Sequence, residues 1–184
     1  MSDELAGRRL SLLKETVPSA TRVGVLYNPT EPPTKVEMRE TEAAAAQLGL
    51  TLQPLAATST DDLAQRFADA AAGGCDAILT FAHGFAFFHR RRIAELAAQH
   101  RLPAMYGWRE HAEVGGLMTY GPNVTATLRR AASYVDRVLK GAKPSDLPVE
   151  QPTAFELVIN LKTAKALGIE IPQNVMARAD NVIE

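Results

Sequence analysis

The sequence has few of the features that form disulfide bonds, metal clusters or membrane spans. It has 184 residues with one cysteine, Cys75, so an internal disulfide and a cysteine-based metal cluster are both excluded. A single cysteine does not distinguish a reducing compartment from an oxidising one. The chain also lacks an excess of charge of either sign, because it has 20 basic and 21 acidic residues. The field that would hold nucleic acid or an anionic membrane is therefore absent, and no nucleic-acid partner is expected.

The N-terminal stretch, MSDELAGRRLSLLKE, contains no long apolar run and places acids before bases. It fits neither a secretory signal nor a membrane span. If the protein is exported, its signal lies outside this chain. If Met1 is the native start, a cytoplasmic protein is expected.

Sequence motifs of the common enzyme classes are missing as well. There is no G-x-S-x-G elbow, no G-x-G-x-x-G turn after a strand and no Walker loop. His83 has no second ligand at metal spacing, and the basic run His89 to Arg92 is typical of a solvated helix face. The sequence therefore predicts a protein that is not an enzyme and that needs no cofactor or metal.

Alternating strand-like and helix-like segments make up most of the chain. The apolar run Arg22 to Tyr27 has no polar alternation, which is typical of a central strand covered on both faces. Leu50 to Leu55 contains Pro54, which cannot donate to a ladder and so favours a sheet edge. Further strands are expected at Ala77 to Phe81, Pro103 to Tyr106 and Leu117 to Tyr120. This pattern predicts an α/β fold with a flavodoxin-like, doubly wound parallel sheet in the order 2-1-3-4-5.

The segment Gly115 to Asn123 marks a change in organisation. Gly121-Pro122 is expected to break the fifth strand, and Asn123 to cap a helix that begins at Val124 and ends before Gly141. This appended helix is amphipathic, and one apolar stripe carries Val124, Leu128, Ala131, Ala132, Val135 and Val138. A proline-rich connector then leads to a sixth strand-like run, Phe155 to Asn160, and to a short helix that ends at Gly168.

Three long segments carry a specific resemblance: RVGVLYNP, HRRRIAELAAQHRLPAMYGWREHAEVGGLMTYGPN and VLKGAKPSDLPVEQPTAFELVINLKTAKALG. They resemble the periplasmic substrate-binding proteins of ABC transporters, in the group that includes tryptophan and tyrosine binders. Such proteins have two α/β lobes with the ligand trapped between them, and this chain resembles the second lobe and the C-terminal return. The resemblance implies that residues 1–122 and 153–184 form the second-lobe domain. It assigns residues 123–152, a helix and connector, to the first lobe, and it implies a periplasmic location and an ABC permease as partner.

Candidate binding residues are those that follow the strands, because ligands of doubly wound sheets lie beyond the carboxyl ends of the strands. Aromatic rings with polar tips at this edge would suit a planar or aromatic solute. The candidates are Asn28, Phe81, His83, Tyr106, Trp108 and Tyr120. Each has a structural alternative: Tyr106 and Tyr120 as strand-end core residues, Trp108 as packing over the sheet end, and Asn28 as a turn former.

Two functions from different classes follow. The first is a solute-binding component of an ABC-type importer, or a truncated lobe of one, which binds a small amino-acid-like solute, with aromatic solutes as candidates. The alternative is a single-lobe sensor or self-assembling interaction module. Because the apolar stripe of the appended helix has no sheet of its own to cover, the sequence also predicts a homodimer formed through that stripe.

Overall fold

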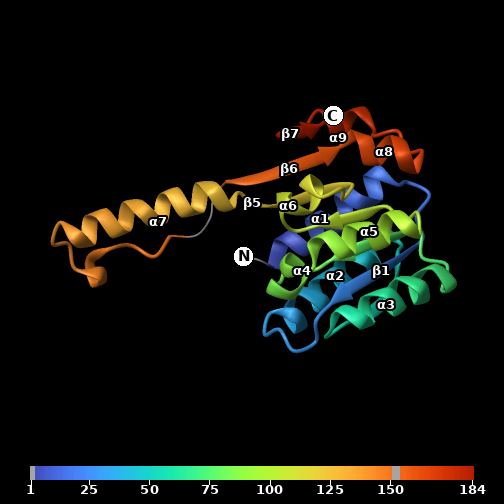
Figure 1. The fold of residues 1–184 in the computed structure, drawn as a ribbon, viewed down its shortest axis with the longest axis horizontal. Coiled ribbons are helices and arrows are strands. Elements are labelled where there is room, and N and C mark those ends of the chain that lie inside the picture. The colour runs from blue at the N-terminus through green and yellow to red at the C-terminus, as the bar shows by residue number, and fades with distance from the viewer. Residues whose placement is uncertain (1–2, 151–153) are drawn as a thin grey trace.

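The sheet of this protein runs through an α/β body from which one helix projects as a long arm (Figure 1). The computed structural model describes residues 3–150 and 154–184. Its strands are β1 (Arg22–Tyr27), β2 (Thr51–Ala56), β3 (Ala77–Thr80), β4 (Ala104–Tyr106), β5 (Met118–Pro122), β6 (Phe155–Asn160) and β7 (Asn181–Ile183). Its helices are α1 (Asp3–Thr16), α2 (Thr34–Leu48), α3 (Thr60–Ala72), α4 (Gly84–Phe88), α5 (Arg90–Gln99), α6 (Arg109–Glu113), α7 (Val124–Leu139), α8 (Leu161–Leu167) and α9 (Gln173–Met176), with a 3-10 turn η1 (Pro144–Asp146).

The sheet has the order β2-β1-β3-β4-β5-β6-β7. The first five strands are parallel, which confirms the predicted fold class and the order 2-1-3-4-5. β2, which carries Pro54, is an edge strand, as its proline predicts. β6 runs antiparallel to β5, and β7 pairs with β6 in parallel, so the C-terminal return extends the same sheet by two strands.

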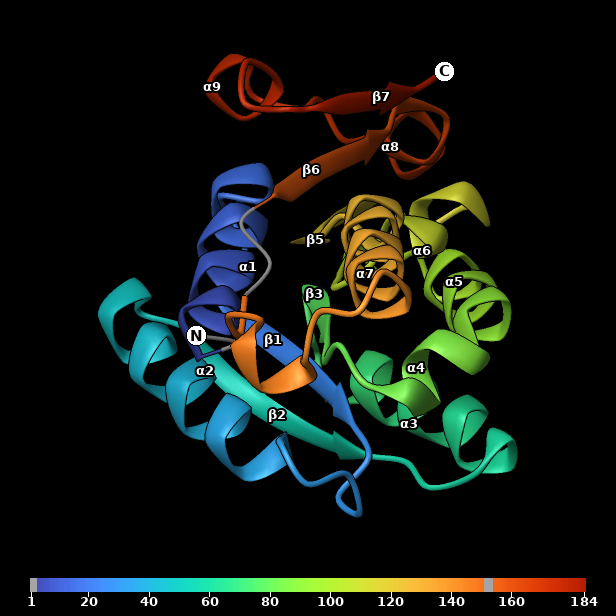
Figure 2. The same ribbon diagram turned by 90° about the vertical axis from the view of Figure 1, so that its left-hand side faces the viewer.

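Helices cover both faces of the sheet (Figure 2). On one face α1 packs along α2 and against β3, β4 and β5, with Leu10 and Leu13 in the core beneath it. On the other face α3 packs against α5, where Leu63 and Phe67 are buried. The α3 helix begins with a capping box, in which Ser59 Oγ accepts from the Asp62 N–H at 3.3 Å and Asp62 Oδ2 accepts from the Ser59 N–H at 2.9 Å.

Three local expectations need correction. β5 continues through Gly121 and Pro122 and is not broken there, because both residues pair with the antiparallel strand β6. Proline is tolerated at this position because it is the last residue of the strand. Two short helices, α4 and α6, also fill loops in which the sequence predicts none, directly after β3 and β4.

The ends of β4 and β5 lie so close that two glycines are required. A Cβ on Gly121 would lie 1.8 Å from the backbone oxygen of Gly107, and a Cβ on Gly107 would lie 2.3 Å from Ala82 Cβ. The backbones at the ends of β4 and β5 therefore approach each other closely at Gly107 and Gly121. The chain passes from Pro122 almost directly into α7.

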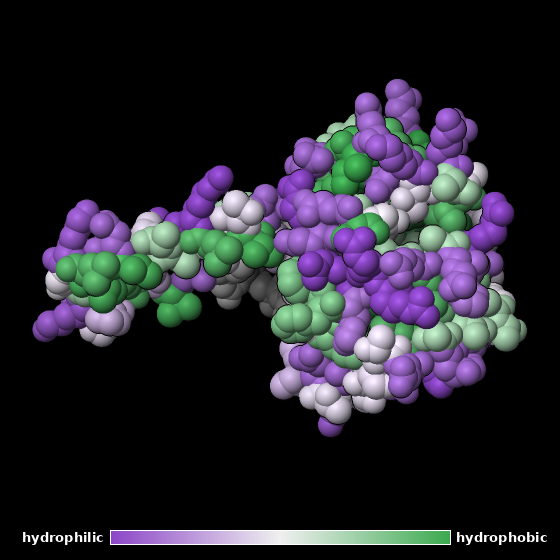
Figure 3. Space-filling view, viewed as in Figure 1, coloured by the Kyte–Doolittle hydropathy of each residue, from purple (hydrophilic) through white to green (hydrophobic). Residues whose placement is uncertain are grey.

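The arm consists of α7 and the connector that returns along it (Figure 1). Asn123 Oδ1 caps α7 by accepting from the Ala126 N–H at 2.8 Å, as predicted. The Tyr134 hydroxyl donates to the Pro148 carbonyl at 2.8 Å, and Arg130 pairs with Glu150. Apolar side chains nevertheless face outward along the arm (Figure 3), with Leu128 65% and Val135 58% exposed.

Candidate functional site

The carboxyl ends of β1, β3, β4 and β5 meet at one edge of the sheet, because these strands are parallel. The arm projects from this same edge, since α7 follows the end of β5 directly (Figure 1). The carboxyl edge and the arm therefore bound the space where a ligand of a doubly wound sheet would lie.

Asn28, directly after β1, is engaged in a turn. Its side-chain Oδ1 accepts from the Thr30 N–H at 2.9 Å and from the Thr30 hydroxyl at 2.8 Å. Its backbone carbonyl accepts from the Thr34 hydroxyl at 2.8 Å. The structure thus gives Asn28 the turn-forming role that is the structural alternative to ligand contact.

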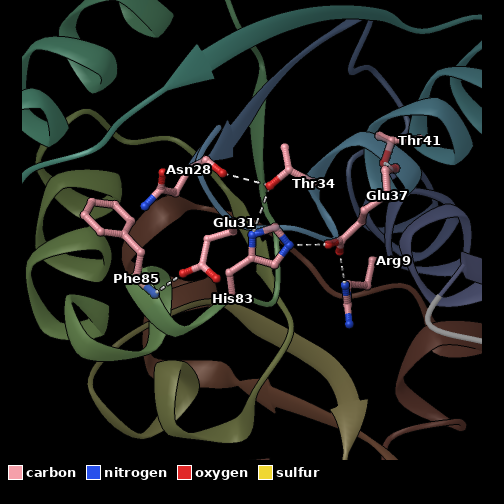
Figure 4. A network of polar contacts seen from close by, with 8 residues as sticks. All are labelled: Arg9, Asn28, Glu31, Thr34, Glu37, Thr41, His83 and Phe85. Atoms are coloured by element: carbon pink, nitrogen blue, oxygen red, sulfur yellow. Dashed lines mark hydrogen bonds and ion pairs between the residues drawn. The ribbon is translucent and has the colours of Figure 1, made fainter.

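His83 lies after β3 and belongs to a buried polar network (Figure 4). Its Nε2 lies 2.8 Å from Glu37 Oε2, and Glu37 Oε1 accepts from Arg9 Nη1 at 2.9 Å. Arg9 Nε in turn donates to the Tyr120 carbonyl in the middle of β5, at 2.8 Å. Burial lowers the pKa of Arg9, whereas the charge of Glu37 and its hydrogen bond raise it. One network therefore joins two helices to β5 and to the segment after β3.

Phe81 and Tyr106 are core residues in this structure. Phe81 packs between Tyr27 and His83, with ring centroids 6.1 and 5.8 Å away. Tyr106 is fully buried and stacks on His111 with ring centroids 4.6 Å apart. Burial raises the pKa of the Tyr106 hydroxyl far above its usual range. Both side chains support the edge from below and do not line its surface.

Trp108 is half-buried at the rim, directly before α6. It meets Phe87 of α4 edge-to-face, with ring centroids 5.1 Å apart. The next residue, Phe88, is 78% exposed. Two short helices that the sequence did not predict thus place three aromatic rings at the carboxyl edge, where stacking against a planar solute is possible.

Tyr120 closes the other side of the edge. Its ring stacks on Phe155 at 6.3 Å, and the Arg8 guanidinium carbon lies 5.1 Å from the ring centroid. Among the six predicted site residues, Asn28 and Trp108 are half-buried, whereas Phe81, His83, Tyr106 and Tyr120 are buried. No group of three or more metal-ligating side chains occurs in the described part of the chain.

Arg9, Glu37, Phe87 and Phe88 were missed by sequence reasoning. A signal for the first two was present, because Arg9 lies on the apolar stripe of its helix together with Ala6, Leu10 and Leu13. Glu37 likewise shares the buried face of α2 with Thr34, Thr41 and Ala45. A charged residue on a buried stripe indicates a paired buried charge, but the sequence does not name its partner.

The joint between the body and the arm is also polar. Glu156 of β6 accepts from Arg109 Nη1 at 3.0 Å and from Asn123 Nδ2 at 3.1 Å. The Asn123 N–H donates to the Ala154 carbonyl at 3.0 Å. The first residue of α6, next to Trp108, is thereby tied to the residue that caps the arm.

The fold defines a class: an α/β lobe of the periplasmic-binding-protein type, with an arm that projects from the carboxyl edge of its sheet. Residues 2–183 match the family of ABC transporter substrate-binding proteins. The chain belongs to that family, which is one of binding proteins and not of enzymes. None of the helices that the structure describes is long and apolar enough to cross a membrane.

Three individual proteins are similar to this chain. A tyrosine-binding protein of Clostridioides difficile (strain R20291) is 21% identical over 163 residues, which cover 89% of this chain and 47% of that protein. The structure of a conserved domain protein from Vibrio cholerae O1 biovar eltor superposes with a TM-score of 0.86 and 27% identity, over 96% of this chain and 60% of that one. An ABC domain of Streptococcus pneumoniae in complex with L-Trp gives 0.85 and 29%, over 97% and 62%. The chain therefore spans about half to three fifths of the length of these relatives.

Proposed function

We propose that this chain forms one wall of a solute-binding cleft and serves as the solute-binding component of an ABC-type importer, working with an ABC permease outside the cytoplasm. The solute is small and amino-acid-like, and an aromatic side chain suits the site best. Residues 1–122 and 153–184 would form the lobe, and residues 123–152 would belong to the opposing one. The Streptococcus relative, at 29% identity, is bound to L-Trp, which supports this substrate class.

The observation that carries the proposal is the aromatic rim at the carboxyl edge. Trp108 and Phe87 are in contact there, Phe88 is exposed beside them, and the rim lies on the edge from which the arm projects. Aromatic faces with a few directed polar groups bind planar solutes through stacking and hydrogen bonds. Among the six predicted residues, Trp108 and Tyr120 are proposed as ligand contacts. Asn28 and His83 are proposed to shape the edge without contacting the solute. Phe81 and Tyr106 are proposed to support the edge from the core.

A single wall predicts weak binding. Affinity in such clefts depends on burying most of the ligand, and one lobe leaves one side of the solute in water. We expect a dissociation constant of about 1 mM or weaker for L-tryptophan or L-tyrosine with the monomeric chain. Micromolar binding by a proven monomer would contradict the single-wall argument.

The test is an NMR titration with L-tryptophan. Because Trp108 is the only tryptophan, its indole N–H gives one resolved reporter at the rim. Saturable shifts of that signal and of amides that follow β3, β4 and β5 are expected, with none for D-glucose. Trp108→Leu removes the indole signal and should abolish the amide shifts, whereas His100→Asn, at the opposite edge where α5 leads into β4, should leave both. Shifts spread evenly over the body, or absent up to the solubility limit, would contradict the proposal.

We propose as a second candidate function that the chain self-assembles through the arm. The stripe of Val124, Leu128, Ala131, Ala132, Val135 and Val138 lies on a helix with no buried residue among those that the structure describes. Exposed apolar patches of this kind are costly, and covering them releases about 25 cal/mol per Å². A second copy offers the same stripe, so an isologous helix pair would cover both.

Light scattering on the pair Leu128→Asp and Val135→Asp tests this candidate. A dimer of the unmodified chain should become a monomer with an intact circular dichroism spectrum. The matched control, Arg129→Gln with Lys140→Gln, changes the net charge by the same amount on exposed positions away from the stripe and should leave the dimer unchanged. A monomeric unmodified chain would refute the self-assembly.

A further inference from the structure

We propose that Glu37 is a positioning residue that fixes β5 and the segment after β3 relative to each other, and so sets the shape of the carboxyl edge. It does this through both of its carboxylate oxygens. That this edge holds a solute rests on the proposed function; that Glu37 fixes the edge does not.

The geometry of Glu37 is that of a bridge (Figure 4). Its Oε1 lies 2.9 Å from Arg9 Nη1, and its Oε2 lies 2.8 Å from His83 Nε2. Both distances are typical of charge-assisted hydrogen bonds. All three side chains are buried, with Arg9 3%, Glu37 8% and His83 5% exposed. The bridge is therefore shielded from water. Such hydrogen bonds are stronger in this low-dielectric environment than in water.

The bonds that leave the bridge lead to the sheet and to the loop after β3. Arg9 donates to the Tyr120 carbonyl in the middle of β5, at 2.8 Å. His83 directly precedes α4, the helix that carries Phe87, and its own N–H donates to the Phe81 carbonyl. Glu37 thus connects β5, through Arg9, to the loop between β3 and α4.

The end of β1 joins the network through α2. Thr34, on the same face of α2 as Glu37, donates its hydroxyl proton to the Asn28 carbonyl at 2.8 Å and lies 3.4 Å from His83 Nδ1. The longer contact places the Thr34 hydroxyl beside the ring that Glu37 holds. The end of β1, the segment after β3 and the middle of β5 are all connected in this way.

Holding the helices together does not require these bonds. α1 already packs along α2, and its Leu10 and Leu13 are fully buried in the core. Burying an Arg–Glu pair in place of apolar side chains generally brings little stability, because both charges lose their water. What the network adds is a set of directed bonds to backbone and loop atoms at the edge.

The substitution Glu37→Gln separates the effect of the two hydrogen bonds from the effect of the negative charge. The glutamine Oε1 can accept from Arg9 while its amide donates to an unprotonated His83 Nε2, with the ring proton on Nδ1 facing Thr34. Glu37→Gln therefore keeps both bonds and loses the charge that compensates Arg9. Glu37→Ala loses both bonds and the charge.

The experiment is amide hydrogen exchange on the solute-free chain with Glu37→Ala, Glu37→Gln and Leu63→Ala. The last variant opens a cavity in the other core and lowers global stability without touching the network. Exchange of amides 81–87, 119–121 and 123 should accelerate by about tenfold or more in Glu37→Ala, beyond the change in α3, because a lost buried charged hydrogen bond frees these segments locally. Glu37→Gln and Leu63→Ala should raise exchange only in step with global unfolding.

Uniform acceleration over all amides in Glu37→Ala would overturn the proposal and make the network merely structural. So would an equally strong local effect in Glu37→Gln. An L-tryptophan titration of the same variants keeps the two ideas apart. If the unmodified chain shows no binding, the proposed function fails while the exchange result still decides the role of Glu37. If it binds, Glu37→Ala should weaken binding and Glu37→Gln should restore it.

Discussion

Acidification should destabilise this protein through His111 before most carboxylates are protonated. His111 is buried in α6 and stacks on Tyr106 with an interplanar angle of 18°. Burial lowers its pKa from 6.5 to about 4, opposed by the backbone of Trp108, whose carbonyl lies 3.2 Å from Nδ1. The folded state therefore binds the His111 proton more weakly than the unfolded chain does.

The size of the effect follows from these two pKa values. The stabilisation by neutral His111 is fully present above pH 6.5 and is lost as the pH falls toward about 4. Between pH 7 and pH 5 the free energy of unfolding should fall by about 2 kcal/mol from this residue alone. That is a large fraction of the stability of a typical domain.

Urea unfolding at pH 7, 6 and 5, followed by Trp108 fluorescence, measures this loss. His111→Phe keeps a ring against Tyr106 and removes the titration, so its free energy of unfolding should vary much less over this range. Leu63→Ala, a destabilised control with His111 intact, should retain the full pH dependence. If His111→Phe loses stability between pH 7 and 5 as steeply as the unmodified chain, the reasoning is refuted.

Three further substitutions, two of them with a control variant, test the close backbone approach and two side chains that bond to backbone N–H groups. All are measured by urea unfolding. Gly121→Ala should cost about 3 kcal/mol or more, because its Cβ would meet the Gly107 oxygen at 1.8 Å, whereas Gly7→Ala, whose Cβ would lie 3.4 Å from Ala44 Cβ, should be neutral or stabilising; equal effects would contradict this. Ser59→Ala should cost about 1 kcal/mol by removing the cap of α3, and no loss would show that the capping box is dispensable. Asp76→Ala should cost about 1 kcal/mol or more, because Asp76 Oδ2 accepts the Thr21 and Arg22 N–H groups at 2.7 and 2.9 Å; Asp76→Asn should restore part of it.

The order of the sheet could be predicted because its determinants are local. An uninterrupted apolar run marks β1 as a doubly covered strand, and Pro54 marks β2 as an edge. Helix ends were equally accessible, since Gly49 and Gly168 end α2 and α8 with positive φ angles of 64° and 73°. Each of these features depends on a few neighbouring residues.

The remaining elements depend on residues that are distant in the chain. β5 extends through Pro122 only because Phe155 pairs with it from the other strand. Glu37 and His83 are 46 positions apart, and nothing in either segment specifies the other. The rim is a similar case: Trp108 was predicted at the edge, but its partner Phe87 lies on α4, which is too short for hydrophobic periodicity to reveal.

Hydrogen bonds on both sides of Asn123 join the arm to the body of the protein. Asn123 caps α7 with its Oδ1, while its amide nitrogen donates to Glu156, which also accepts from Arg109. The same Asn123 continues β5, whose last residues pair with β6. A reorientation of the arm at Asn123 must therefore either break these bonds or carry Arg109 with it. Because Arg109 follows Trp108 directly, the arm and the aromatic rim are mechanically connected through Glu156.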